Sequence, residues 1–224
     1  MADWQIVARI HNDFTDKFGI PRQSGLVPEV VSTIVFEENY RSREALRGIE
    51  QFSHLWLLWL FSENQREGWS PTVRPPRLGG NRRMGVFATR SPFRPNPIGL
   101  SSVKLLGVEE TADHGLVLRV SGADLMDGTP ILDIKPYLEY ADSHPGAGNG
   151  FVEEFVDYAV QVHFPEDLLA KVGEGQREAL LAVLRQDPRP SYQHDPERVY
   201  ALSFGDYTVQ FQVHDDTLTV VNVK

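Results

Sequence analysis

The connections between the strand-like runs in the first two thirds of the sequence constrain its fold more than any other feature. The runs are rich in β-branched and aromatic residues, are separated by Gly, Pro, Asp and Asn, and cover residues 4–10, 30–36, 54–61, 85–88, 98–106, 116–120 and 131–134. Successive parallel strands need a crossover of about a dozen residues or more, usually a helix. No helical pattern of that length separates these runs. The sequence therefore predicts a mainly antiparallel sheet, closed or nearly closed into a small barrel, which also protects the sheet edges.

Two local signals refine this first part. Ser42 is a good N-cap for a short helix over residues 43–49. The stretch Asp127-Gly-Thr-Pro130 has the residues of a tight turn that precedes a strand.

The last third of the chain has a different pattern. A Gly-rich loop at residues 143–150 is followed by an expected strand at 155–164 and a helical stretch at 165–185, which Gly173 and Gly175 should split in two. Three more strands are expected at 199–204, 207–213 and 217–223. The sequence thus predicts a β-barrel domain at residues 1–143, a linker at 144–154 and a C-terminal α+β domain at 155–224.

Charge is distributed unevenly along the chain. The whole sequence carries −9, yet residues 66–94 contain seven arginines and one acid, Glu67. A local positive field on an acidic protein can attract a polyanion such as RNA. The alternative is a basic loop that is merely solvated.

Several classes of site and location find no support in the sequence. It has no cysteine, no HxxxH or HExxH spacing, no phosphate-binding glycine motif and no nucleophile elbow. No apolar run approaches the roughly 18 residues of a membrane span, and the start of the chain has no basic region followed by an apolar one. We expect a cytoplasmic protein with neither a metal nor a membrane partner.

Two irregular stretches remain. Residues 71–85 form a long, basic, non-periodic loop, a kind that is often functional. In the second, Pro92, Pro95 and Pro97 stiffen a segment that carries Arg90 and Arg94. Arginine's planar fork suits carboxylates and phosphates, so this segment is a reasonable anion or nucleotide contact. The alternative is a proline-rich barrel corner with salt-bridged arginines.

These stretches resemble a known family. MGVFATRSPFRPNPIGLSSVKL (residues 84–105), with PTVRPPRLGGN before it and DGTPILDIKPYL after it, resembles the TsaA-like (YaeB/TrmO) tRNA methyltransferases. IPRQ (20–23), EQFSHLW (50–56) and DPRPSY (187–192) extend the likeness over nearly the whole chain. The resemblance implies a β-barrel that binds S-adenosylmethionine, a C-terminal domain that contacts tRNA, and a homodimer.

The resemblance also implies site residues. The expected cofactor contacts are Pro21, Arg22, Gln23, Ser62, Glu63, Arg90, Leu100, Asp127, Gly128, Thr129 and Pro130. The catalytic candidates in the C-terminal domain are Asp187, Arg189 and Tyr192, unless that loop only ends a helix and packs. The expected RNA contacts are Arg74, Arg77, Arg82, Arg83 and Arg94.

The implied reaction is methyl transfer from S-adenosylmethionine to N6 of threonylcarbamoyladenosine at position 37, in the anticodon loop of threonine tRNA. Because the leaving group is already good, most of the catalysis would come from positioning the two reactants. Two other classes stay open: a non-catalytic module that binds S-adenosylmethionine or RNA, and a methyltransferase that acts on a small molecule.

Overall fold

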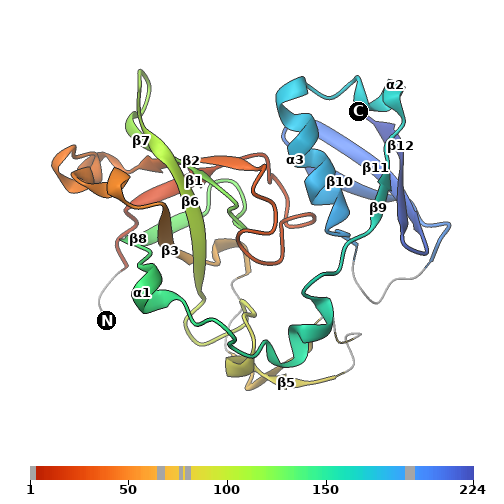
Figure 1. The fold of residues 1–224 in the computed structure, drawn as a ribbon, viewed down its shortest axis with the longest axis horizontal. Coiled ribbons are helices and arrows are strands. Elements are labelled where there is room, and N and C mark those ends of the chain that lie inside the picture. The colour runs from red at the N-terminus through yellow and green to blue at the C-terminus, as the bar shows by residue number, and fades with distance from the viewer. Residues whose placement is uncertain (1–3, 65–68, 76–77, 79–81, 190–194) are drawn as a thin grey trace.

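The first part of the chain forms a closed six-stranded barrel (Figure 1). The computed structural model describes residues 4–64, 69–75, 78, 82–189 and 195–224. The barrel strands are β1 (Ala8–His11), β2 (Val31–Phe36), β3 (His54–Leu60), β6 (Ile98–Thr111), β7 (Gly115–Ser121) and β8 (Pro130–Pro136). They follow the order β1-β2-β7-β6-β3-β8, and every neighbouring pair is antiparallel. The predicted mainly β fold with an antiparallel barrel is confirmed.

Alternating side chains fill the barrel interior. In β3 the inward residues are Leu55, Leu57 and Trp59, which are at most 7% exposed, while their neighbours face outward. This period of two is what a strand with one buried face requires. The remaining elements before β9 are short. They are β4 (Thr72–Val73), β5 (Met84–Gly85), α1 (Glu139–Asp142) and 3₁₀ helices at Glu38–Tyr40, Glu44–Leu46, Ile49–Gln51, Ser62–Asn64, Val86–Ala88 and Gly150–Phe155.

The C-terminal unit is a four-stranded sheet covered by helices. Its strands are β9 (Gln161–His163), β10 (Tyr200–Phe204), β11 (Tyr207–His214) and β12 (Thr217–Val223), in the order β10-β11-β12-β9. The helices are α2 (Glu166–Leu169) and α3 (Glu174–Arg185), so the predicted division near Gly173 is confirmed. Among the residues that the structure describes, no helix is long and apolar enough to cross a membrane.

Three local predictions are wrong. Residues 85–88 form the end of β5 and then a 3₁₀ turn, in which Thr89 N–H donates to the Val86 carbonyl. Residues 43–49 form a 3₁₀ turn at Glu44–Leu46 and the start of another at Ile49 in place of one helix; the N-cap of the first is Arg43, which makes no side-chain cap bond, and Gly48 adopts a left-handed φ of 86°. The strand expected at 155–164 is reduced to β9, since pairing with β12 extends over three residues only.

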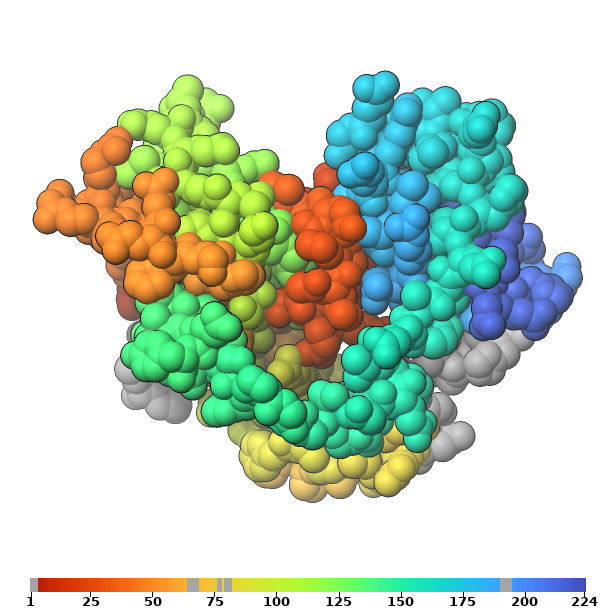
Figure 2. Space-filling view, viewed as in Figure 1, coloured from red at the N-terminus to blue at the C-terminus, as the bar shows by residue number. Residues whose placement is uncertain are grey.

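One segment joins the two units. Residues 12–30, between β1 and β2, which we call the connecting segment, leave the barrel and pack against the C-terminal unit. Phe14, Val27 and Val30 are each 1% exposed and belong to the same apolar core as α3 and the C-terminal sheet. Figure 2 shows the segment, in orange-red, filling the space between the two units. The connecting segment, although it lies early in the chain, therefore completes the core of the C-terminal unit.

Candidate functional site

The connecting segment gathers residues that are far apart in the sequence. Its side chains or backbone form hydrogen bonds with Glu63, Arg90, Asp127 and Asp187, each of which is an expected site residue. The side chain of Asn12 fixes the start of the segment by donating to the Leu125 carbonyl at 3.0 Å. The expected cofactor contacts thus lie around one segment.

Arg90 is held in place without being neutralised. Its Nη1 donates a short hydrogen bond to Oε1 of Gln23, and the side chain is otherwise exposed. Within the described residues, no carboxylate lies within ion-pair distance of Arg90. A positioned guanidinium with an uncharged partner retains donors for an anionic ligand.

A buried carboxylate lies behind Arg90. The Trp59 indole donates to Ser101 Oγ at 3.0 Å, and Ser101 donates in turn to Oδ1 of Asp124. Burial raises the pKa of Asp124, while the hydrogen bond from Ser101 and the charge of Arg90 act in the opposite direction. This line of side chains runs from the barrel interior towards the exposed arginine.

The raised pKa of Asp124 has a consequence for stability. Because the folded-state pKa lies above the unfolded value, the charged form is destabilising at neutral pH, and this cost disappears as pH falls through the raised pKa. Asp124→Asn is therefore expected to be at least as stable as the wild type at pH 7 and to lose that advantage at lower pH. Urea unfolding at several pH values measures this, with the exposed Asp113→Asn as control; a difference that does not change with pH would contradict it.

The turn at residues 127–130 has the expected shape. Gly128 adopts φ 74°, and Thr129 N–H donates to the Met126 carbonyl at 3.2 Å, so this is the predicted tight turn before β8. Asp127 Oδ1 accepts from the Asn12 backbone N–H at 3.1 Å and lies 3.1 Å from His11 Nδ1. The Asp127 carboxylate is 40% exposed, so it remains accessible to a ligand.

The remaining expected cofactor contacts lie beside the same segment. Leu100, on the outer face of β6, is 53% exposed, and two residues further along this strand Ser102 N–H donates to Ser24 Oγ at 3.2 Å. Lys17 Nζ donates to the Glu63 carbonyl at 2.6 Å, which places the Ser62–Asn64 turn against the segment. Pro21 itself is buried.

Arg22 points away from the barrel. Its Nη2 donates to the carbonyls of Asp187 at 3.1 Å and Arg189 at 3.4 Å. Burial lowers the pKa of Arg22, and the nearby charge of Asp187 partly offsets this. Of the two adjacent expected cofactor residues, Gln23 faces Arg90 and Arg22 faces the C-terminal unit.

The C-terminal candidates Asp187 and Arg189 are buried, with 4% and 9% exposure. Arg189 Nε donates to both carboxylate oxygens of Asp187 at 3.0 Å, and the Tyr158 hydroxyl donates to Oδ2 at 2.7 Å. The third candidate, Tyr192, lies outside the described residues.

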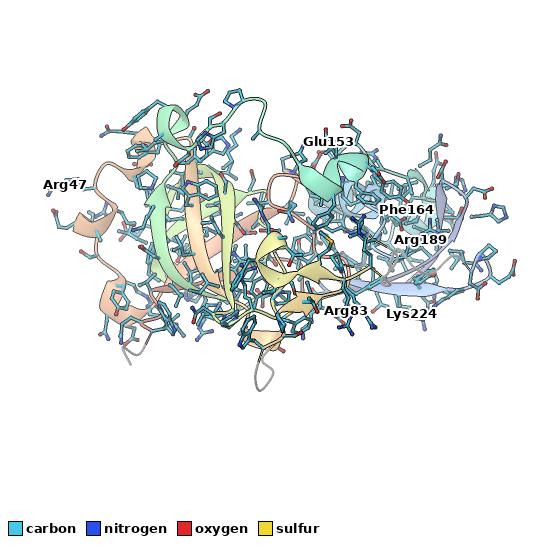
Figure 3. The ribbon with its side chains drawn as sticks, turned by 90° about the horizontal axis from the view of Figure 1, so that it is seen from below. Arg47, Arg83, Glu153, Phe164, Arg189 and Lys224 are labelled. Carbon is cyan, nitrogen blue, oxygen red and sulfur yellow. The ribbon has the colours of Figure 1, made fainter. Side chains whose placement is uncertain are left out.

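The expected RNA contacts differ in their availability. Arg74, Arg82 and Arg83 are exposed, whereas Arg94 folds back so that Nη1 donates to the Thr89 carbonyl at 2.9 Å. Arg83 lies on the side of the barrel that faces the C-terminal unit, opposite Arg47 (Figure 3). Arg77 lies outside the described residues.

Sequence reasoning missed two residues of this site. Asp124 carried one weak signal, a single acid between apolar residues in Ala123-Asp-Leu125. Tyr158 carried none, because its neighbours in the sequence do not distinguish it from the other tyrosines. As for metals, the part of the chain that the structure describes contains no group of three or more His, Asp or Glu side chains that could hold an ion.

Comparison with known proteins accounts for both units. The family model of the tRNA-methyltransferase O N-terminal domain matches residues 9–143, and that of the TrmO C-terminal domain matches residues 157–224. The tRNA (adenine(37)-N6)-methyltransferase of Escherichia coli is 42% identical over 92% of this chain and 91% of its own length. A Pseudomonas aeruginosa protein, described as an S-adenosylmethionine-dependent methyltransferase, is 42% identical over 97% and 95%.

The fold agrees with these matches. A crystal structure of TrmO from Pseudomonas aeruginosa superposes with a TM-score of 0.81 and 35% identity, covering 100% of this chain and 97% of the other. Both units and their order along the chain are therefore shared. The chain belongs to the tRNA-methyltransferase O family.

Proposed function

We propose that this protein transfers a methyl group from S-adenosylmethionine to N6 of threonylcarbamoyladenosine at position 37 of threonine tRNA. The observation that carries the proposal is a match, over 92% of this chain and both of its units, to a relative named for methylation of N6 of adenine 37. The chain is an S-adenosylmethionine-dependent methyltransferase that acts on N6 of the adenine at tRNA position 37. The threonylcarbamoyl group and the threonine isoacceptor are the finer part of the proposal.

The residues around the connecting segment fit the cofactor. S-Adenosylmethionine supplies the methyl group when bound, and it presents a carboxylate, two positive centres and an adenine. Arg90 suits the carboxylate, the accessible oxygens of Asp127 suit a positive centre, and the exposed Leu100 offers apolar contact. Arg22 does not suit the carboxylate, because its guanidinium donates to the backbone of the C-terminal unit.

The basic loop suits the RNA. Arg82 and Arg83 are exposed and can contact phosphates of an anticodon loop, whose unstacked bases are accessible to proteins. The carboxylate of the threonyl group also needs a cation. Arg82 and Arg83 serve better than Arg94, whose guanidinium already donates to its own loop.

Incubation with labelled S-adenosylmethionine tests the activity. The protein is offered unfractionated tRNA from cells with and without the threonylcarbamoyl modification, followed by nucleoside analysis. Methyl label in threonylcarbamoyladenosine of threonine tRNA is the expected result. Label in unmodified adenosine would remove the finer part of the proposal, cofactor binding without transfer would favour a binding module, and transfer only to small molecules would favour a different substrate class.

The basic loop gives a prediction on salt dependence. Arg82→Ala and Arg83→Ala are each expected to weaken tRNA binding and to reduce the slope of log affinity against log salt by about 0.7. Fluorescence anisotropy with labelled tRNA measures the slope, at salt concentrations from about 50 to about 300 mM, which bracket the physiological value. Arg43→Ala is the matched control, because this exposed arginine pairs with Glu110 on the barrel. A slope unchanged from the wild type would show that the loop holds no phosphate.

We also propose the domain division 1–143, 144–154 and 155–224, a homodimer and a cytoplasmic location. The two family matches, at residues 9–143 and 157–224, support the division. Exposed apolar side chains support a dimer: Trp69 and Phe87, whose rings pack on each other, are 53% and 72% exposed. The absence of cysteine supports the location.

A further inference from the structure

Three side chains form a hydrogen-bonded cluster in the C-terminal unit, and Arg189 Nη2 also donates to the Asp215 carbonyl at 3.5 Å. The carboxylate of Asp187 accepts from Arg189 through both oxygens at 3.0 Å and from the Tyr158 hydroxyl at 2.7 Å. Tyr158 comes from the connection before β9, whereas Asp187 and Arg189 follow α3. Burial, and then the hydrogen bond to Asp187, raises the pKa of the Tyr158 hydroxyl, so it stays a donor at neutral pH.

The backbone at Asp187 turns sharply at the end of α3. Its φ of 49° lies in the left-handed region, which residues other than glycine, asparagine and aspartate seldom adopt and which commonly ends a helix. Here the geometry directs the carbonyls of Asp187 and Arg189 at one group.

That group is the guanidinium of Arg22. Its Nη2 donates to the two carbonyls at 3.1 and 3.4 Å. The next residue, Gln23, accepts from Arg90, and Ser24 Oγ accepts from the backbone of β6. A continuous series of contacts thus links the cluster to the arginine that suits the cofactor.

We propose that Tyr158, Asp187 and Arg189 are positioning residues: by holding Arg22, they place Gln23 and Arg90 where S-adenosylmethionine binds. The proposal rests on the function proposed above and assigns a role to Tyr158. It also changes the expected role of Asp187 and Arg189 from catalysis to support. Asp187 and Arg189 are 4% and 9% exposed, and the Arg189 guanidinium donates to the Asp187 carboxylate and to the Asp215 carbonyl, so they act through Arg22.

The role predicts a particular kinetic effect. Loss of a positioning group weakens cofactor binding, because Arg90 is no longer held in the binding geometry, whereas turnover at saturating cofactor is retained. Tyr158→Phe removes one donor and leaves the ring. It is expected to raise the KM for S-adenosylmethionine, and the Kd for its demethylated product, about tenfold, as for loss of a hydrogen bond to a charged group. The expected kcat lies within about twofold of the wild type.

Calorimetric titration with S-adenosylhomocysteine and steady-state kinetics with tRNA measure these constants. Tyr140→Phe is the matched control, because Tyr140 is 90% exposed and outside the cluster. Asp187→Asn is a second variant, since asparagine tolerates the left-handed backbone while the charge on Arg189 loses its partner. All variants are compared well below the lowest of their melting temperatures, so that partial unfolding does not alter the measured KM, Kd and kcat.

The outcomes separate the possibilities. A raised KM and Kd with retained kcat, in both cluster variants and not in Tyr140→Phe, supports the positioning role. A loss of kcat at saturating cofactor with unchanged Kd would overturn it, because the cluster would then act on the reacting atoms. Unchanged constants in both variants would also overturn it. Wild-type protein that binds neither cofactor nor product would overturn the proposed function itself, and this role with it.

Discussion

Arg90→Ala is expected to weaken binding of S-adenosylmethionine about 100-fold. The reason is that Arg90 presents a fixed, exposed guanidinium that pairs with no carboxylate of the described residues, and a charge-assisted pair with the cofactor contributes about 3 kcal/mol. A difference of about 1.4 kcal/mol corresponds to a factor of ten in affinity. Calorimetric titration with the cofactor and with its demethylated product measures the effect, which should be similar for both because both carry the carboxylate.

The control is another exposed arginine. Arg47→Ala removes a side chain that pairs with Glu44 and lies on the far side of the barrel (Figure 3). It is expected to bind the cofactor like the wild type. If Arg90→Ala bound it equally well while remaining folded, the site around the connecting segment would be misassigned.

Gly99→Ala is expected to destabilise the barrel by about 3 kcal/mol. A Cβ at this position would lie 2.2 Å from the ring of Trp59, closer than a real Cβ contact allows. The indole cannot move aside without loss, because it is 7% exposed, packs in the barrel core and donates to Ser101. Urea unfolding followed by circular dichroism measures the change in the free energy of unfolding.

Gly85→Ala is the matched control for this change. Gly85 has an ordinary φ of −58°, and among the described residues no heavy atom lies within 4 Å of the Cβ that would be added. The free energy of unfolding of the Gly85→Ala variant is expected to stay within about 0.5 kcal/mol of the wild-type value. Equal effects of the two substitutions would mean that the glycine at 99 is not required by Trp59.

Predictions from sequence succeeded for the barrel and for the paired helices. The runs of β-branched and aromatic residues, with no helical pattern between them, predicted an antiparallel barrel, and the two apolar runs around Gly173 predicted two helices. They failed at residues 43–49 and 85–88, where the pattern is short, and at residues 155–164, of which only three pair with β12. In the two short segments a few hydrogen bonds or a glycine with positive φ outweigh intrinsic preference.

For the candidate site, the family motifs predicted residues but not the contacts between them. The sequence places Gln23 and Arg90 67 positions apart, and nothing in either stretch indicates that one would bind the other. Likewise, Arg22 belonged to an expected cofactor motif, yet its guanidinium serves the C-terminal unit. Such pairings depend on the path of the chain, which residue types alone do not specify.

The sequence by itself determined the kinds of structure: an antiparallel β-barrel, an α+β unit after it, and an arginine-bearing stretch stiffened by prolines. These features depend on the spacing of side chains along the chain and on local restriction of the backbone. Only the tertiary structure decided that the connecting segment completes the second core with Phe14, Val27 and Val30. Burial of these side chains against α3 brings Arg22 to Asp187 and Gln23 to Arg90. Long-range apolar packing, which no local pattern encodes, thus sets the geometry of the site.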